Sequence, residues 1–219
     1  MTRLFIQCAC TAFLCFASSG CALLSKSEPL TPRYFTLVDS NDSSSVQPAA
    51  GPSEGAQRLA LGRVSAGAPL RERILYRNGD HEVGYYDDRR WTERPDAYLR
   101  RALVETLFEK RGLQRVTSGA APMLQAELVT FEEIRGDQPR VRMQVVITLD
   151  DDRTTQLTET ITVERPIKDV SGDEQANAVA AAFAEALHAG VAEIADHVSA
   201  KLATAEAASP VAVEAATTP

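Results

Sequence analysis

The clearest pattern in the chain is an alternation of apolar and polar residues that begins at Val141. Apolar side chains occupy every second position from Val141 to Leu149. The alternation resumes with Leu157, Ile161 and Val163, after an acidic stretch that starts at Asp150, although Glu159 interrupts it. Because successive side chains of a strand point to opposite faces, this period predicts two strands that each have one apolar face. We therefore expect an antiparallel hairpin that rests one face on a core.

Two other segments repeat their apolar residues every three or four positions, which is the helical period. The first spans residues 95–111. It starts at Pro95, where a helix tolerates the missing N–H, and Gly112 follows as the expected C-terminal cap. The second spans residues 173–203 and is rich in alanine. At 1.5 Å per residue the second helix reaches about 45 Å, which is longer than a small sheet needs for cover.

Shorter apolar and β-branched runs predict the remaining strands. The dipeptide Asn78-Gly79 is a strong signal for a hairpin turn between two of them. These strands are expected at residues 33–38, 59–64, 74–77, 81–86, 113–116 and 123–132. Together the patterns predict an α+β fold: a sandwich in which a mixed, largely antiparallel sheet is packed by one mid-chain helix and a long C-terminal helix.

Two segments lack any periodic apolar pattern. Residues 39–57 are rich in Ser, Pro, Gly and Ala, and we expect a flexible loop there. Residues 204–219 are rich in Ala, Pro and Thr, and we expect a disordered tail. The remaining part, residues 33–203, is long enough to form a single domain that includes the loop.

The beginning of the chain has a pattern of its own. Arg3 precedes an apolar run from Leu4 to Ala17, and three small residues stand directly before Cys21. A positive start, a short apolar run and a small-residue site are typical of a secretory signal peptide. The run is also shorter than the roughly 20 apolar residues that a membrane span needs. We therefore predict that residues 1–20 are removed.

A Cys directly after small residues also resembles the bacterial lipobox, in which a peptidase cuts before an acylated Cys. All four cysteines lie at or before position 21, so the exported part cannot form an internal disulfide. Cys21 is therefore the predicted lipidation site, and residues 21–32 are the predicted tether. An uncleaved anchor or an ordinary signal peptide is the alternative, because Ser18 stands where a lipobox usually has an aliphatic residue.

Charge and hydropathy reduce the number of function classes that fit the chain. The formal net charge is −7, and it becomes −8 when Arg3 is removed with the signal peptide. An acidic chain without a tract rich in Lys or Arg is a poor candidate for binding nucleic acid. Beyond the signal region no run approaches the roughly 18 consecutive apolar residues that indicate a further membrane span. We expect a soluble domain on a lipid tether.

Residues that could carry catalysis or bind a metal are sparse. His81, His188 and His197 lack the spacing of a metal site, and the acidic run from Asp150 lacks the Gly and Glu of a calcium-binding loop. No Gly-x-Ser-x-Gly motif is present. We expect no catalytic site, no metal site and no cofactor other than the lipid on Cys21.

One segment, residues 61–91, combines arginine with large aromatic residues. These residue types are over-represented among the anchors of protein interfaces. An ordinary strand pair with a core Trp is the alternative explanation. The candidate partner interface consists of Arg63, Arg73, Tyr76, Arg77, Tyr86 and Trp91.

Several blocks in and near this segment follow one another in a recognisable order. They are Tyr34–Leu37, Leu59–Ser65, Pro69–Arg77, Glu82–Tyr86 and Arg90-Trp91. In this order and spacing, and with the long Ala-rich helix, the chain resembles the ABC-type transport auxiliary lipoprotein family over roughly residues 21–203. The helix start Trp91–Pro95, the loop at 39–57 and the tail depart from the pattern of that family.

The resemblance implies a non-catalytic lipoprotein of the bacterial outer membrane that faces the periplasm. It also implies partners, namely a mammalian-cell-entry (MCE) domain protein and an ABC permease with its ATPase, in a system for lipid transport. Acyl chains on Cys21, palmitate among them, would hold the chain at the bilayer. Ala22 follows the Cys in place of Asp, so the usual signal for retention in the inner membrane is absent.

Other classes of protein stay open on the sequence. The chain could be an outer-membrane assembly or structural lipoprotein that binds an envelope protein or polymer. A periplasmic enzyme is disfavoured, because the usual nucleophile and acid/base sets are missing. The long Ala-rich helix is also compatible with homo-oligomerisation.

Overall fold

The computed structural model describes residues 30–37, 56–151, 154–172 and 174–208. The chain divides into two compact units, residues 1–31 and residues 32–219, and the second unit holds the fold described below. The predictions for the signal peptide, for Cys21 and Ala22, for nearly all of the 39–57 loop and for residues 209–219 of the tail lie outside the described residues.

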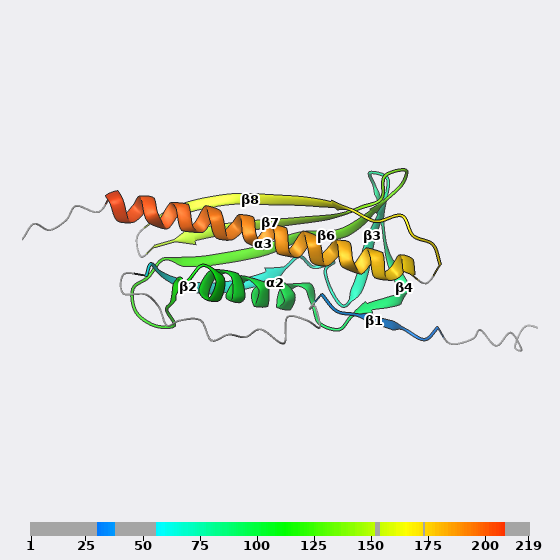
Figure 1. Ribbon diagram of the computed structural model, residues 1–219, viewed down its shortest axis with the longest axis horizontal. Coiled ribbons are helices and arrows are strands. Elements are labelled where there is room, and N and C mark those ends of the chain that lie inside the picture. Colours follow the sequence, from blue (N-terminus) through cyan, green and yellow to red (C-terminus); the bar gives the residue numbers. More distant parts are fainter. Residues whose placement is uncertain (1–29, 38–55, 152–153, 173, 209–219) are drawn as a thin grey trace, which may run out of the picture. The chain divides into compact units, whose positions relative to one another are not determined.

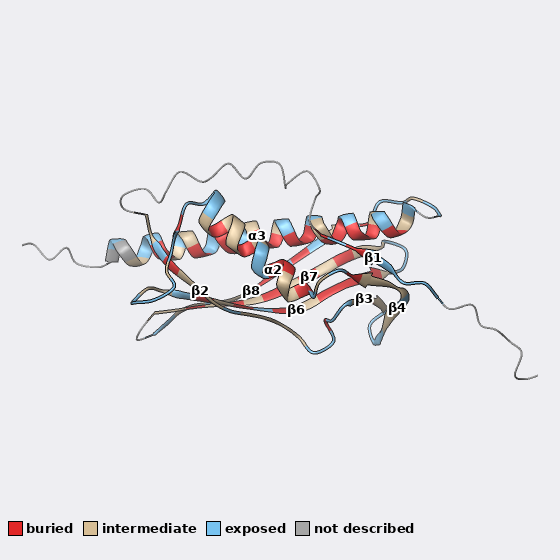
Figure 2. Cartoon of the chain, turned by 90° about the horizontal axis from the view of Figure 1, so that it is seen from below, coloured by how far each residue is buried: buried red, intermediate tan, exposed pale blue. Residues whose placement is uncertain are grey.

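Eight strands form one mixed sheet, and two helices cover one of its faces (Figures 1 and 2). The strands are β1 (Arg33–Phe35), β2 (Arg58–Ala66), β3 (Arg73–Asn78), β4 (Glu82–Trp91), β5 (Gln114–Arg115), β6 (Met123–Arg135), β7 (Arg140–Asp150) and β8 (Thr155–Pro166). The helices are α2 (Pro95–Val104), which continues into the π-helical segment η3 (Glu105–Lys110), and α3 (Glu174–Ala208). The predicted α+β fold is confirmed.

Strand β6 organises the sheet, because it is paired along both edges. On one edge its first half pairs in parallel with β2, and its last three residues pair in parallel with β3. On the other edge it pairs antiparallel with β7, which in turn pairs antiparallel with β8. Strand β4 joins β3 antiparallel, and β1 and β5 add short parallel pairings. The antiparallel pairings contain most of the paired residues, as predicted.

The hairpin of β7 and β8 is the part of the sheet that the alternation predicted. Every odd-numbered side chain of β7 from Val141 to Leu149 is buried, and Ile161 and Val163 are buried opposite them on β8. These side chains form the face of the sheet that α3 covers. The other face of β7 and β8 carries the even-numbered side chains. We call it the helix-free face.

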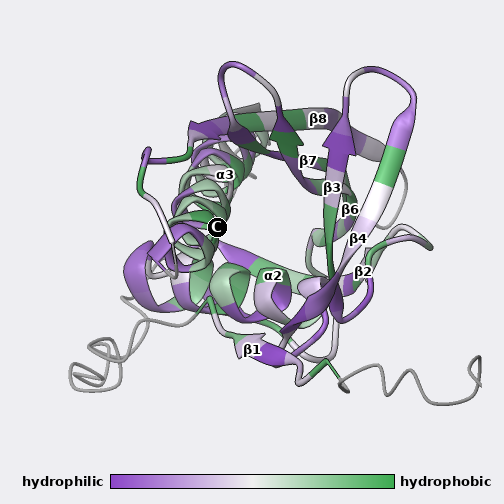
Figure 3. Cartoon of the chain, turned by 90° about the vertical axis from the view of Figure 1, so that its right-hand side faces the viewer, coloured by the Kyte–Doolittle hydropathy of each residue, from purple (hydrophilic) through white to green (hydrophobic). Residues whose placement is uncertain are grey.

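Helix α3 packs on β7 and β8 and supplies one side of the core, which Figure 3 shows as an apolar interior between the helices and the sheet. Phe183 is fully buried at its centre and packs edge-to-face on Trp91 and Phe131, with ring centroids 5.0 and 4.6 Å away. By length and composition alone α3 could cross a membrane, but half of its most apolar window is buried in the domain. It therefore packs as a core helix does.

Helix α3 continues five residues past the predicted end at 203, so the prediction of a disordered tail starts too early. Leu202 in the last part of the helix is still buried. Four of the five added residues are not β-branched and three are alanine, which has the highest helix propensity. The composition of this segment predicts disorder, but its alanines extend the helix instead.

The predicted helix at 95–111 is a regular α-helix only up to Val104. From Glu105 the turns are wider, and the N–H of Arg111 donates to the carbonyl of Thr106, five residues back. In a helix with 3.6 residues per turn, leucines spaced by four residues do not stay on one face, because each is rotated slightly relative to the one before. The wider turns offset this rotation, and Leu103 and Leu107 are both fully buried.

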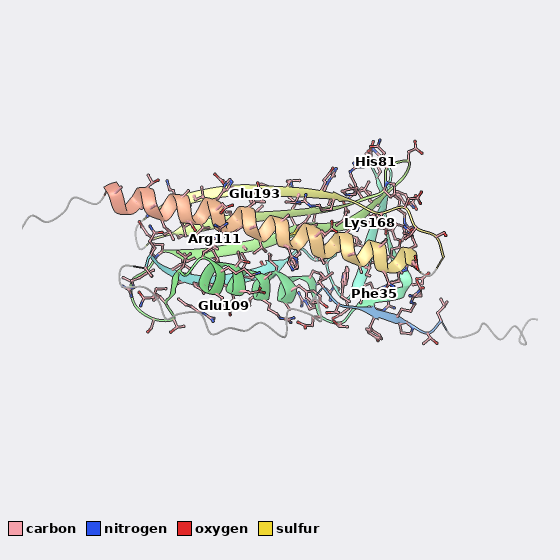
Figure 4. The ribbon with its side chains drawn as sticks, viewed as in Figure 1. Phe35, His81, Glu109, Arg111, Lys168 and Glu193 are labelled. Carbon is pink, nitrogen blue, oxygen red and sulfur yellow. The ribbon has the colours of Figure 1, made fainter. Side chains whose placement is uncertain are left out.

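The predicted hairpin turn at Asn78-Gly79 is confirmed. Asn78 pairs with Glu82 across the turn, and Gly79 has a φ of 61°, a conformation that favours glycine. The return strand β4 runs to Trp91, five residues beyond its predicted end. His81 lies at the tip of this hairpin (Figure 4).

Candidate functional site

Strands β3, β4 and the end of β6 bring much of the predicted interface together. This corner contains Glu132 and Glu133, which are 2% and 5% exposed and are the buried charged residues among those described. Because they are neighbours on one strand, their side chains point to opposite faces of the sheet. Each carboxylate is met by groups from β3 or β4. We call this set the β3–β4–β6 corner: Tyr76, Arg77, Tyr86, Arg89, Glu132, Glu133 and Arg135.

Glu132 is neutralised by Arg77. The guanidinium donates from Nε and Nη2 to the two carboxylate oxygens, at 2.8 and 3.0 Å. This bidentate geometry is the strongest form of the pair. The hydrogen bonds with Glu132 raise the pKa of Arg77 above its ordinary value. The pair is therefore a fixed ionic contact between β3 and β6.

Glu133 is held by a different set of groups. The hydroxyl of Tyr86 donates to its Oε2 at 2.6 Å, and Nε of Arg135 lies 3.6 Å from Oε1. Burial, followed by this hydrogen bond, raises the pKa of the Tyr86 hydroxyl. The guanidinium of Arg135 stacks 3.4 Å from the ring centroid of Tyr76 and 4.6 Å from that of Tyr86.

A second arginine closes the stack from β4. The guanidinium of Arg89 lies 4.0 Å from the ring centroid of Tyr86. Its Nε and Nη1 are shielded from solvent and make no hydrogen bond with the described residues, although Nε lies 3.9 Å from the carboxylate of Asp88. The ring of Tyr86 thus has two guanidinium groups of the chain itself, those of Arg89 and Arg135, within cation–π distance.

The six predicted interface residues do not form one surface. Tyr76 and Tyr86 join in the stack on the side of Glu133, whereas Arg77 lies on the opposite side with Glu132. Arg73 binds the carboxylate of Asp87 at 2.8 Å and the backbone of β4. Arg63 is exposed and lies elsewhere, on β2.

Trp91 was predicted as part of the interface, and the structure corrects this. Its side chain is only 2% exposed. It packs on Phe183, Phe131 and Tyr98, with centroid distances of 5.0 to 6.4 Å. The strand pairing that carries Trp91 turns its ring under α3, so the alternative of a core Trp is the right one.

Arg63 belongs to a groove on the helix-free face, with a volume of about 400 Å³. Strand pairing sets Ser65 beside Glu127, and Glu127 opposite Val146. The groove therefore offers a cation, a carboxylate and several uncharged polar groups. Its side chains come from β2, β6 and β7: Arg63, Ser65, Ala66, Gln125, Ala126, Glu127, Val146 and Thr148.

The same face carries an ionic ladder nearer the β3–β4–β6 corner. Nε of Arg142 donates to Oε1 of Glu164 at 2.7 Å, and Nε of Arg140 donates to its Oε2 at 2.9 Å. The bond from Arg142, with the positive charge of Arg140, lowers the pKa of Glu164. Polar contacts thus cross from β7 to β8.

Sequence reasoning did not identify the acidic half of the corner. The signal that could have identified it is the pair Glu132-Glu133, which stands directly between the apolar residues Phe131 and Ile134. Acidic residues in such a position are buried only when they are paired. The identity of their partners depends on which strands flank β6, and the local pattern does not contain that information.

The histidines do not assemble into a site. His188 is exposed, and Nδ1 of His197 contacts the carboxylate of Glu159 on β8. Among the residues that the structure describes, no three His, Cys, Asp or Glu side chains are grouped so that they could hold a metal ion.

Comparison with known proteins places the chain in a class. The model of the ABC-type transport auxiliary lipoprotein component family matches residues 39–198, and the chain belongs to this family. This confirms the family to which the sequence blocks pointed. No curated protein matches the sequence at a significant level.

Solved structures share the fold. One is a protein of the DUF330 family from Xanthomonas campestris, with 20% identity, a TM-score of 0.63 and coverage of 80% of this chain and 99% of that one. Another is a hypothetical protein from Chlamydia trachomatis, with 11% identity, a TM-score of 0.52 and coverage of 68% and 99%. At these identities the likeness shows the fold alone.

Proposed function

We propose that the chain is a non-catalytic lipoprotein of an MCE/ABC-type lipid transport system, and that it bridges the outer membrane to periplasmic partners. The observation that carries the proposal is the family match over residues 39–198, since the family is one of auxiliary lipoproteins of ABC-type transport. The sequence before the domain supports it, because a signal peptide followed by Cys21 gives the chain a lipid anchor.

The chemistry of the domain supports docking to a protein. The two buried carboxylates of the β3–β4–β6 corner, Glu132 and Glu133, are paired with groups of the chain itself. The groove on the helix-free face is different, because Arg63 and Glu127 have no charged partner among the described residues. We assign the groove as the docking surface for the MCE-domain protein, with Arg63 and Glu127 as the groups that recognise it.

Affinity purification from membranes tests this assignment. The full chain, tagged at its C-terminus, is cross-linked in cells and purified in mild detergent. We expect the MCE-domain protein, the permease and the ATPase to co-purify. Arg63→Glu combined with Glu127→Arg should reduce their recovery several-fold without changing the unfolding temperature. The matched control is Arg71→Glu combined with Glu185→Arg, which also leaves the net charge unchanged and changes two exposed residues outside the groove; it should leave recovery unchanged.

Two results would contradict the proposal. The first is recovery of an outer-membrane assembly protein or an envelope polymer in place of the transport components. The second concerns the anchor: Cys21→Ala should abolish labelling by a palmitate analogue and release the chain from the membrane fraction. Unchanged labelling and fractionation of this variant would exclude acylation at Cys21.

A further inference from the structure

We propose that strand β8 pairs antiparallel with β8 of a second copy of this chain, so that two sheets continue into one another. This inference goes beyond the transport role and does not depend on it. It rests on the outer edge of β8, which is the last strand of the sheet beside β7 (Figure 1). Among the described residues no strand pairs with that edge.

The direction of the backbone groups of β8 follows from one hydrogen bond. The N–H of Ile167 donates to the carbonyl of Pro139, just beyond the Arg140–Pro166 pair. In an antiparallel ladder, pairs that exchange hydrogen bonds alternate with pairs that do not. The odd-numbered residues of β8 therefore bond to β7, and the even-numbered ones direct N–H and C=O outward. From Thr158 to Glu164 this leaves a row of unpaired backbone groups, which is a template for another strand.

The sequence of β8 selects a register for pairing with itself. With Thr162 opposite Thr162 of the second copy, Ile161 faces Val163 on the side that α3 covers. On the same side Glu159, whose Oε2 also contacts His197 of its own chain, faces Arg165. Opposite charges and β-branched pairs at directly opposed positions stabilise a sheet. Other registers lose the pair of opposite charges. When the second copy is shifted by two residues in one direction, Arg165 faces Leu157, and when it is shifted by two in the other direction, Arg165 faces Ile161. A shift of four in the latter direction sets Glu164 against itself.

The ends of the strand agree with this register. Pro166 has no N–H, and it is one of the residues that direct their backbone outward. In the proposed register Pro166 faces Thr158 at each end of the ladder, and one hydrogen bond is lost at each end. The ladder then runs from residue 158 to residue 166 on both copies, and it retains the charge complementarity at both ends.

Cysteine cross-linking of the full chain tests the register. Thr162→Cys should give a disulfide-linked dimer on mild oxidation of membranes, because residue 162 faces its own copy. Thr160→Cys is the matched control, since it is also exposed and outward-directed but faces residue 164. Both variants and the parent chain have the same native cysteines, so the result is the amount of dimer that Thr162→Cys forms above the amounts in the parent chain and in Thr160→Cys. No excess, equal excess in both variants, or cross-linking to a different protein would overturn the proposal.

Charge reversal separates a specific contact from general association. Glu159→Arg and Arg165→Glu should each weaken the dimer about tenfold in sedimentation experiments, because each places like charges opposite one another. The double variant should restore it, since opposite charges then face one another again with their positions exchanged. Failure of the double variant to recover, while circular dichroism shows both single variants folded, would exclude this register. Thr162→Pro should give a folded monomer, because its N–H is not bonded to β7.

Discussion

At the scale of single residues, two adjacent buried glutamates on β6 link neighbouring strands of the sheet. Glu132 and Glu133 lie where water is excluded, and an unpaired carboxylate there would be costly. Arg77 neutralises the first on one face of the sheet, and Tyr86 with Arg135 stabilises the second on the other. The corner therefore joins β3, β4 and β6 through side chains as well as through the backbone. Both carboxylates are used in these contacts within the chain.

The Arg77–Glu132 pair should be needed for stability. Arg77→Met leaves the Glu132 carboxylate buried without a partner, and we expect a loss of about 1–3 kcal/mol in the free energy of unfolding, because Arg77 is partly exposed. Urea unfolding measures this loss. Arg71→Met is the control, since Arg71 is exposed and its guanidinium bonds only to the carbonyl of Ala68. Equal losses in both variants would show that the pair is not responsible.

Gly84 has a packing role beside the aromatic stack. A Cβ atom at this position would lie 2.5 Å from Cζ of Tyr76, so the ring would have to leave Arg135. We expect Gly84→Ala to cost about 1–3 kcal/mol, as overpacking does. Gly67→Ala provides the comparison, because its Cβ would meet no atom closer than 3.5 Å. Thermal unfolding followed by circular dichroism should show a lower midpoint for Gly84→Ala only.

The sequence predicted elements well where one period persists over many residues. The alternation from Val141 to Val163 is compatible only with strands, and the period up to Leu202 only with a helix, since in each case one face must be buried. The wider turns after Val104 and the sharing of one β6 edge by β2 and β3 have no local signal. For the same reason Trp91 was assigned to a surface: only the pairing of β4 shows that its ring lies under α3.

The ladder between β7 and β8 should make the stability of the hairpin pH-dependent. The pKa of Glu164 is lowered in the fold, so its ionised form stabilises the native state above the ordinary pKa. This contribution is lost as the pH falls through the lowered pKa. The difference in unfolding midpoint between the parent chain and Glu164→Gln should therefore be largest above the ordinary pKa of glutamate and shrink as the pH falls through the lowered pKa.

At the scale of the molecule, one face of the sheet forms the core and the other, the helix-free face, is polar. Helices α2 and α3 cover the first, and the groove and the ionic ladder occupy the second. The free edge at β8 adds a third place for contact. A domain with these separate surfaces can be held to a membrane, meet a partner and meet a second copy without competition between the three.

Strand β1 belongs to the core of the domain, although residues 38–55 separate it from β2. Phe35 and Leu37 are buried, and β1 pairs in parallel with β4. A fragment that spans residues 32–219 should therefore unfold in one transition with the midpoint of the mature chain. A fragment that begins at residue 56 should unfold at a lower temperature, because two apolar side chains worth about 1.5–3 kcal/mol each are missing. Equal midpoints of the two fragments would contradict this.

The position of β1 has a consequence for proteolysis. If Cys21 carries the lipid, the covalent path from the membrane reaches β1 first and then passes through residues 38–55 to the rest of the domain. After a single cut in that segment, non-covalent contacts would hold the domain to β1, among them a three-residue ladder and the buried side chains of Phe35 and Leu37. Burial of these two side chains supplies about 3–6 kcal/mol, which corresponds to binding weaker than micromolar. A single proteolytic cut would thus allow the domain to dissociate from the lipid-bearing segment.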